Sequence, residues 1–265
     1  MTLPVDLWSY CQLTCTSKTG PCEIIAPLPK AEQTAKLLLK KMKITHGFSI
    51  TLELQRNIPI GKGLSSSTAD MLAVVRAFQS SFKIDINQVE TSELFSQIEP
   101  HDPLHFSQCV AYNHREGLLL KALDYIPKFH IIGIDSGGEL STTSYNKHLQ
   151  YSDNETRKYD TLFQSLLTAF TQQNDTAIAR CAQQSATLHA HRTNNIFLRN
   201  LLKSVDDWGA MGLIATHSGT CAGVLLPINS PSNQRNKIRH EAKQFGHIFE
   251  TQTLNQPYSP DIATT

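Results

Sequence analysis

Four consecutive hydroxyl side chains follow two glycines in the first third of the chain. The hydroxyl residues are Ser65–Thr68, and the glycines are Gly61 and Gly63. Glycine lets a bound anion approach the backbone closely, so that several loop N–H groups can converge on it. A helix that begins after such a loop adds the positive potential of its dipole at the same point. These residue types in this order favour phosphate binding.

A plainer interpretation is that the hydroxyls only cap a helix. Ser67 and Asp70 have the S-x-x-D spacing of a capping box, although one cap needs only one hydroxyl. Two familiar nucleotide loops do not match the sequence. A Walker A loop would need glycine in place of Arg56 and a hydroxyl in place of Gly63, and a dinucleotide fingerprint would need glycine in place of Ser66.

Two carboxylates form a second candidate site in the segment IEPHDPLHF. Glu99 and Asp102 lie on a short turn that Pro100 and Pro103 stiffen. Carboxylates this close could bind Mg²⁺ together, or one could bind the metal while the other accepts a proton from a hydroxyl. The alternative is an ordinary turn whose aspartate accepts hydrogen bonds from nearby backbone N–H groups.

The elements that must position these residues follow from hydrophobic spacing. The alternation at Ile50–Leu54 predicts a strand before the loop, and LWSYCQLT at Leu7–Thr14 predicts an earlier one. Apolar residues at helical spacing predict a helix after the loop, and they are Met71, Leu72, Val75, Phe78 and Phe82. A helix at Ala31–Met42 is expected to carry its lysines on a solvated face. A helix at Asn87–Ile98 is expected to turn Val89, Leu94, Phe95 and Ile98 inward.

The residue pattern in the second half of the chain predicts a sheet with several helices. A strand pair is expected within Val110–Leu123, and Phe129–Asp135 reads as a buried strand. The further elements expected are helices near 154–173, 175–190, 195–208 and 233–245, and strands at 212–216, 222–226 and 248–253. His189 and His191 are two residues apart on a helix, so we interpret them as unrelated surface histidines rather than a metal site. Residues 255–265 are polar and are expected to fray.

Composition limits the possible partners. The 265 residues carry a net charge of +1 without a long run of one sign, which argues against nucleic acid or a membrane surface as a partner. The sequence contains no apolar run of the roughly 20 residues that a membrane span needs. The six cysteines have neither C-x-x-C nor zinc spacing, and no export signal precedes Leu7. We therefore expect reduced thiols in a cytoplasmic protein.

The glycine-rich loop resembles the phosphate loop of the GHMP kinase superfamily. Pro59–Ala69 reads P-x-x-x-G-L-S-S-S-T-A, where the family usually has P-x-x-x-G-L-G-S-S-A-A, so Ser65 replaces a glycine and Thr68 an alanine. Within the superfamily the chain is most similar to the L-threonine kinases of bacterial cobalamin synthesis. Four stretches in the expected order carry this resemblance: Pro4–Asp6, Gly61–Asp70, Glu99–Asp102 and His217–Gly219.

The resemblance implies an α+β fold of two domains. Residues 1–126 would form a ribosomal-protein-S5-domain-2-like domain with a left-handed β-α-β unit, and residues 127–265 a ferredoxin-like domain. The resemblance also implies a glycine-rich motif and a strand before Pro4, where only Met1–Leu3 stand. We therefore expect the first domain to lack its first strand and to have an unpaired sheet edge.

The resemblance assigns roles residue by residue. It implies that ATP binds at a loop comprising Pro59, Gly61, Lys62, Gly63, Leu64, Ser65, Ser66, Ser67 and Thr68, although Lys62 could equally be a solvated loop lysine. Mg²⁺ would be held by Ser66 or Ser67 and by Glu99. Asp102 would be the general base, although the family usually reads E-P-T-D-S around it, so that His101 and Pro103 are departures. A turn at His217, Ser218, Gly219 and Thr220 would support the loop and face the substrate.

The function implied is transfer of the γ-phosphoryl group of ATP to the hydroxyl of L-threonine or a similar small molecule, by a possible homodimer. Two alternatives stay open. One is a kinase for another small alcohol, such as homoserine or an intermediate of specialised metabolism. The other is a binding module of the same fold that has lost turnover.

Overall fold

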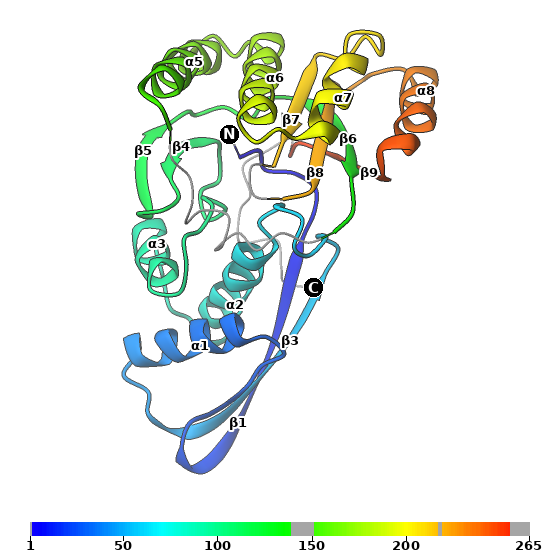
Figure 1. The fold of residues 1–265 in the computed structure, drawn as a ribbon. Helices are drawn as coiled ribbons and strands as arrows, with labels where there is room; N and C mark the ends of the chain where they lie inside the picture. The colour runs from blue at the N-terminus through cyan, green and yellow to red at the C-terminus, as the bar shows by residue number, and fades with distance from the viewer. Residues whose placement is uncertain (1, 139–150, 217–218, 255–265) are drawn as a thin grey trace.

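A computed structural model describes residues 2–138, 151–216 and 219–254 (Figure 1). Its first sheet has three strands. The long strands β1 (Ser9–Pro21) and β3 (His46–Arg56) pair antiparallel. The short strand β2 (Glu23–Ile25) lies on the other side of β3 and runs parallel to it, connected through helix α1 (Pro29–Lys41). Both strands predicted here are present, with β1 longer than the pattern indicated. The left-handed crossover stays a prediction.

Two further helices complete the first half of the molecule. Helix α2 (Ser66–Phe82) follows the glycine-rich loop, and α3 (Gln88–Ser96) precedes the Glu99–Asp102 turn. Their apolar faces pack with α1 and β3 in one core, whose fully buried members include Leu38, Ile50, Met71, Phe78 and Phe95. This burial fixes the direction in which α2 leaves the loop.

One residue of α3 does not lie where the sequence predicted. Val89 is 66% exposed, whereas Leu94 and Phe95 are buried. The buried face of α3 begins at Thr91, and Val89 is roughly 200° away from Thr91 around the helix axis. Asn87 caps this helix with a capping box to Glu90, which places Val89 in the exposed first turn.

The second half of the molecule is built on an antiparallel sheet with strand order β7-β8-β6-β9. The strands are β6 (Phe129–Asp135), β7 (Gly212–Ala215), β8 (Cys221–Pro227) and β9 (His247–Gln252). The helices are α5 (Asp153–Thr171), α6 (Asp175–Arg192), α7 (Ile196–Ser204), α8 (Ser232–Ala242) and the 3₁₀ helix η1 (Lys243–Phe245). All of these elements were expected, within a few residues at their ends. In chain order, the predicted hairpin of β4 (Val110–Asn113) and β5 (Leu118–Ala122) comes before β6 and forms a separate two-stranded sheet.

The interpretation of His189 and His191 as surface residues is half wrong. His191 is exposed, but His189 is only 3% exposed. Position 189 falls on the apolar face of α6 with Ala182, Ala186 and Ala190, so the ring is part of the packing. Burial and the nearby charge of Arg192 lower its pKa to about 4.

The first residues of the chain pair with the last described strand. Val5 forms a bridge with Thr253, the Asp6 N–H donates to the Gln252 carbonyl, and the Leu254 N–H donates to the Pro4 carbonyl. The chain then crosses to the other sheet, where β1 is an edge strand among the described residues. The missing strand itself and the domain boundary at residue 126 stay predictions. Residues 255–265 lie outside the described part of the chain.

Candidate active site

The glycine-rich loop joins β3 to the N-terminus of α2. Its backbone takes left-handed conformations at Gly61, Gly63 and Ser65, with φ angles of 70°, 77° and 58°. Glycine adopts these angles easily and serine does not. Ser65 is therefore strained at the position where the family usually has glycine, and it begins α2 as its N-cap without a side-chain capping bond.

The capping-box interpretation of the serines is wrong. Ser67 Oγ donates to Glu99 Oε1 at 2.5 Å instead of capping α2. Asp70 forms an ion pair with Arg56 and accepts a hydrogen bond from Ser9 Oγ at 2.7 Å. Both residues thus make tertiary contacts, which leaves the N-terminus of α2 free of side-chain caps from them.

Lys30, which no sequence pattern selected, contacts both Ser67 and Glu99. Lys30 Nζ lies 3.0 Å from Ser67 Oγ and 2.6 Å from Glu99 Oε2. Lys30 belongs to the first turn of α1, and it precedes Ser67 by 37 residues and Glu99 by 69. No spacing rule connects positions so far apart, so only the fold brings these three groups together.

The donor set suits Mg²⁺ that arrives on a nucleotide. Ser67 and Glu99 supply one hydroxyl and one carboxylate, both hard oxygen ligands. Within residues 2–138, 151–216 and 219–254, no group of three or more His, Cys, Asp or Glu side chains could hold a metal ion. Mg²⁺ is commonly held by one or two carboxylates together with substrate phosphates, which is the arrangement this pair fits.

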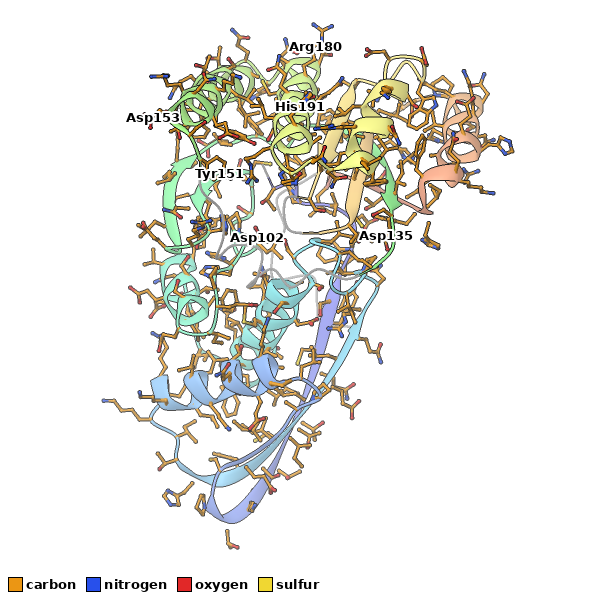
Figure 2. All side chains as sticks on the ribbon, in the orientation of Figure 1. Asp102, Asp135, Tyr151, Asp153, Arg180 and His191 are labelled. Carbon is orange, nitrogen blue, oxygen red and sulfur yellow. The ribbon has the colours of Figure 1, made fainter. Side chains whose placement is uncertain are left out.

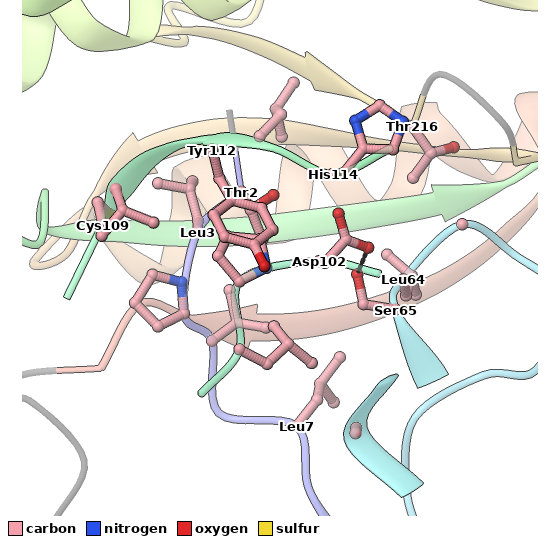
Figure 3. A pocket seen from close by; sticks show the side chains of 18 of the residues that line it. Thr2, Leu3, Leu7, Leu64, Ser65, Asp102, Cys109, Tyr112, His114 and Thr216 are labelled. Carbon is pink, nitrogen blue, oxygen red and sulfur yellow. Dashed lines mark hydrogen bonds between the residues drawn. The ribbon is translucent and has the colours of Figure 1, made fainter. Parts of the chain in front are cut away.

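Asp102 lies between the glycine-rich loop and a cavity of about 610 Å³ (Figure 3). Its carboxylate accepts a hydrogen bond from Ser65 Oγ, and its backbone N–H lies 3.4 Å from Thr68 Oγ1. The Glu99–Asp102 turn is therefore attached to the loop, and the alternative of an aspartate serving only its own turn is wrong. The cavity walls come from both halves of the chain and include Leu3, Leu64, His114 and Thr216.

A buried network of hydrogen bonds connects the Glu99–Asp102 turn to α3 and β4. His101 Nε2 lies 2.7 Å from the hydroxyl of Tyr112, which lies 2.8 Å from Ser92 Oγ. Ser92 Oγ in turn lies 2.7 Å from His105 Nε2. Burial lowers the pKa of His101, and burial with the charges of His101 and Arg76 lowers that of His105 to about 3. Both rings are therefore neutral near pH 7. His101 is buried and supports the turn, and it also lines the cavity.

Lys62 contacts the second sheet. Its Nζ lies 2.9 Å from Asp135 Oδ2 and 2.6 Å from the Gly138 carbonyl, so the interpretation as a solvated loop lysine is wrong. Figure 2 labels Asp102 and Asp135 in the region between the upper and lower parts of the molecule. Burial tends to raise the pKa of Asp135, but hydrogen bonds from Thr220, Lys62 and the Gly137 N–H outweigh it and lower this pKa.

The turn after β7 packs directly on the loop. A Cβ atom on Gly219 would lie 2.1 Å from the Lys62 carbonyl oxygen, and one on Gly63 would lie 2.8 Å from Thr216 Cβ. Thr220 Oγ1 donates to Asp135 Oδ1 at 2.6 Å. The described part of the predicted turn thus touches the loop, and its contact with substrate stays a prediction. His217 and Ser218 lie outside the described residues.

The remaining predicted loop residues take different positions. Pro59 lies at the start of the loop, Leu64 faces the cavity, and Ser66 is the first residue of α2. Ser66 is therefore at the helix terminus, where its backbone N–H can face an anion. Their contacts with ATP stay predictions.

Comparisons with known proteins show what the segment that carries the loop and the turn is similar to. Residues 29–111 match the family model described as GHMP kinases N terminal domain, which covers α1, the loop, α2 and the Glu99–Asp102 turn. The chain is 24% identical to an L-threonine kinase of Citrobacter freundii over 85% of this chain and 78% of that protein. It is also 24% identical to an L-threonine kinase of Salmonella typhimurium LT2, over 67% of this chain and 60% of that protein.

A solved structure of mevalonate kinase from L. major in complex with R-mevalonate has the same fold. Its TM-score is 0.70 at 13% identity, over 97% of this chain and 89% of that one. Residues 29–111 thus match the N-terminal domain of the GHMP kinases, and the chain has the fold of this mevalonate kinase. The solved structure confirms the predicted fold class. The matched domain and the L-threonine kinases support the predicted kind of enzyme, an ATP-dependent phosphotransferase. In the described part of the chain, no helix is long and apolar enough to cross a membrane.

Proposed function

We propose that this protein transfers the γ-phosphoryl group of Mg·ATP to the side-chain hydroxyl of L-threonine. The hydrogen bond between Ser65 and Asp102 carries the proposal, since it puts a carboxylate between the phosphate loop and a substrate-sized cavity. Phosphoryl transfer needs that arrangement, because its loose transition state depends mainly on positioning and charge neutralisation. The two curated L-threonine kinases support threonine as the acceptor.

Each part of the site would have a separate task. The loop N–H groups and the dipole of α2 would hold the triphosphate, and Ser67 and Glu99 would hold Mg²⁺, which neutralises the charge on the phosphates when bound. Asp102 would orient the acceptor hydroxyl and take its proton. Ser66 and Thr68 would add donors at the helix terminus.

A second acceptor class is favoured by the size of the cavity. Its volume of about 610 Å³ lies within the range of roughly 300–1,000 Å³ that drug-sized ligands occupy. Its walls include the apolar side chains of Leu3, Leu104, Phe106 and Leu166. An alcohol larger than threonine, with an apolar body, would fill this space better.

One assay tests both acceptors. ADP release is measured with Mg·ATP and a panel of threonine, homoserine and larger apolar alcohols, for the wild type and Asp102→Asn. The variant should lose about 10²–10⁴-fold in turnover, the usual contribution of a general base. Asp85→Asn makes the same change at an exposed position and should keep full activity. An active Asp102→Asn would reject the assigned base, and turnover with a larger alcohol alone would reject threonine.

A further inference from the structure

Lys30 donates to both side chains that we assign to the metal. Its Nζ lies 3.0 Å from Ser67 Oγ and 2.6 Å from Glu99 Oε2, while Ser67 Oγ donates to Glu99 Oε1 at 2.5 Å. The three groups close a ring in which the serine hydroxyl accepts from the ammonium and donates to the carboxylate. The single proton of the Ser67 hydroxyl is thereby used in the bond to Glu99, and one of its lone pairs accepts from Lys30.

The ammonium and a metal ion compete for the same oxygens. A divalent cation bound to Glu99 would lie within a few ångströms of the Lys30 ammonium, and like charges at that distance repel strongly in a partly buried site. The Glu99 side chain is 21% exposed, so water screens the repulsion incompletely. Both cations therefore cannot remain on Ser67 and Glu99 together.

The backbone of Lys30 is fixed while its side chain can leave. Pro29 begins α1, Thr34 Oγ1 donates to the Lys30 carbonyl at 2.8 Å, and Leu38 anchors the helix in the core. The Lys30 side chain is 46% exposed, and its four methylenes give it rotational freedom. The ammonium can therefore swing away without moving the helix.

We propose that Lys30 is a built-in counter-cation, which holds Ser67 and Glu99 together in the nucleotide-free protein and is displaced when a divalent cation binds. The inference rests on the proposed function insofar as Ser67 and Glu99 are taken as metal ligands. It implies that the empty protein binds free divalent cations poorly. The metal then enters with the nucleotide, whose phosphates supply further ligands and attract the displaced ammonium.

The test measures Mn²⁺ binding to the nucleotide-free protein, using the electron paramagnetic resonance signal of free Mn²⁺ as the readout. Lys30→Gln should bind Mn²⁺ about tenfold more tightly than the wild type, a factor that corresponds to roughly 1.4 kcal/mol. Lys36→Gln removes a lysine of the same helix that pairs with Glu32, and it should bind Mn²⁺ as the wild type does. Glu99→Gln and the double variant Lys30→Gln/Glu99→Gln should show no such gain.

Unchanged Mn²⁺ affinity in Lys30→Gln would overturn the proposal, and so would a gain that persists in the double variant. Lys30→Arg keeps the charge and should bind Mn²⁺ as weakly as the wild type. Lys30→Ala replaces Lys30→Gln if that variant does not fold, as judged by circular dichroism. The experiment contains neither ATP nor an acceptor, so its failure is distinguishable from failure of the ADP-release assay.

Discussion

Lys62 of the phosphate loop forms an ion pair with Asp135 at the end of β6, with 2.9 Å between Nζ and Oδ2. Both side chains are mostly shielded from water. The pair joins the loop that we assign to ATP to the second sheet. Since Thr220 also donates to Asp135, one carboxylate connects the loop, β6 and the turn after β7.

Loss of this ion pair should destabilise the protein. Lys62→Met leaves the mostly buried Asp135 carboxylate without its cation, and the free energy of unfolding should fall by about 1–3 kcal/mol. Lys18→Met, which breaks the exposed pair with Glu23, should cost less than about 1 kcal/mol. Urea titration measures both, and equal losses would contradict the structural role of Lys62.

Two substitutions of Ser65 separate the effect of the strained backbone on stability from the effect of the side-chain hydroxyl. Ser65→Gly and Ser65→Ala both remove the hydroxyl that donates to Asp102, but only glycine relieves the φ angle of 58°. Thermal or urea unfolding should therefore show Ser65→Gly to be more stable than Ser65→Ala by roughly 1–2 kcal/mol. Equal stabilities would mean that residue 65 does not hold the left-handed conformation.

The contact between Gly219 and the loop should be sensitive to one methyl group. Gly219→Ala would place Cβ 2.1 Å from the Lys62 carbonyl oxygen and push the loop aside. The affinity for Mg·AMPPNP, measured by thermal shift, should fall by about tenfold or more, since small displacements at such sites are costly. Gly20→Ala strains a positive φ in open space, so it should lower stability without weakening nucleotide binding. Unchanged affinity in Gly219→Ala would contradict the predicted role of this turn.

Acid should destabilise the protein through His105. The folded-state pKa of this ring is about 3, well below its ordinary value of 6.5, because the ring is buried and lies near the charges of His101 and Arg76. The unfolded chain therefore takes up the proton first, so the stability present above pH 6.5 is lost as the pH falls towards 3.

The size of this effect can be measured by urea titrations between pH 7 and 5. His105 alone should account for about 2 kcal/mol of lost stability between pH 6.5 and 5. His105→Gln should be less stable at pH 7 but should show a correspondingly flatter pH dependence. An unchanged slope would mean that the ring does not remain neutral on folding.

The sequence predicted the elements better than the contacts between them. The strands and helices follow from alternation and helical spacing, which are local properties, so β6 at Phe129–Asp135 was predicted to the residue. Val89 was misplaced because a helix face is defined by the whole buried stripe rather than by each apolar residue. His189 was misplaced because the ring can be buried in its neutral form.

The residues of the candidate site also differ in how far the sequence could identify them. The glycine-rich loop and the Glu99–Asp102 turn were selected from their residue types. Lys30 could not be, because its partners Ser67 and Glu99 reach it only through the packing of α1 against α2 and α3. The contact of Ser65 with Asp102 likewise depends on tertiary structure, since 37 residues separate the two.

The pairing of the first residues with β9 has a mechanical consequence. Because Asp6 is bonded to Gln252 and β1 begins at Ser9, the chain passes between the sheets once there, and it passes again between Ala122 and Phe129. Among the residues that the structure describes, the halves are thus joined covalently at two separate points. A rotation about the line through these two points would strain the backbone least, whereas a twist about another axis would stretch one of the connections. Such a rotation would also have to break the Lys62–Asp135 ion pair, which joins the loop to β6.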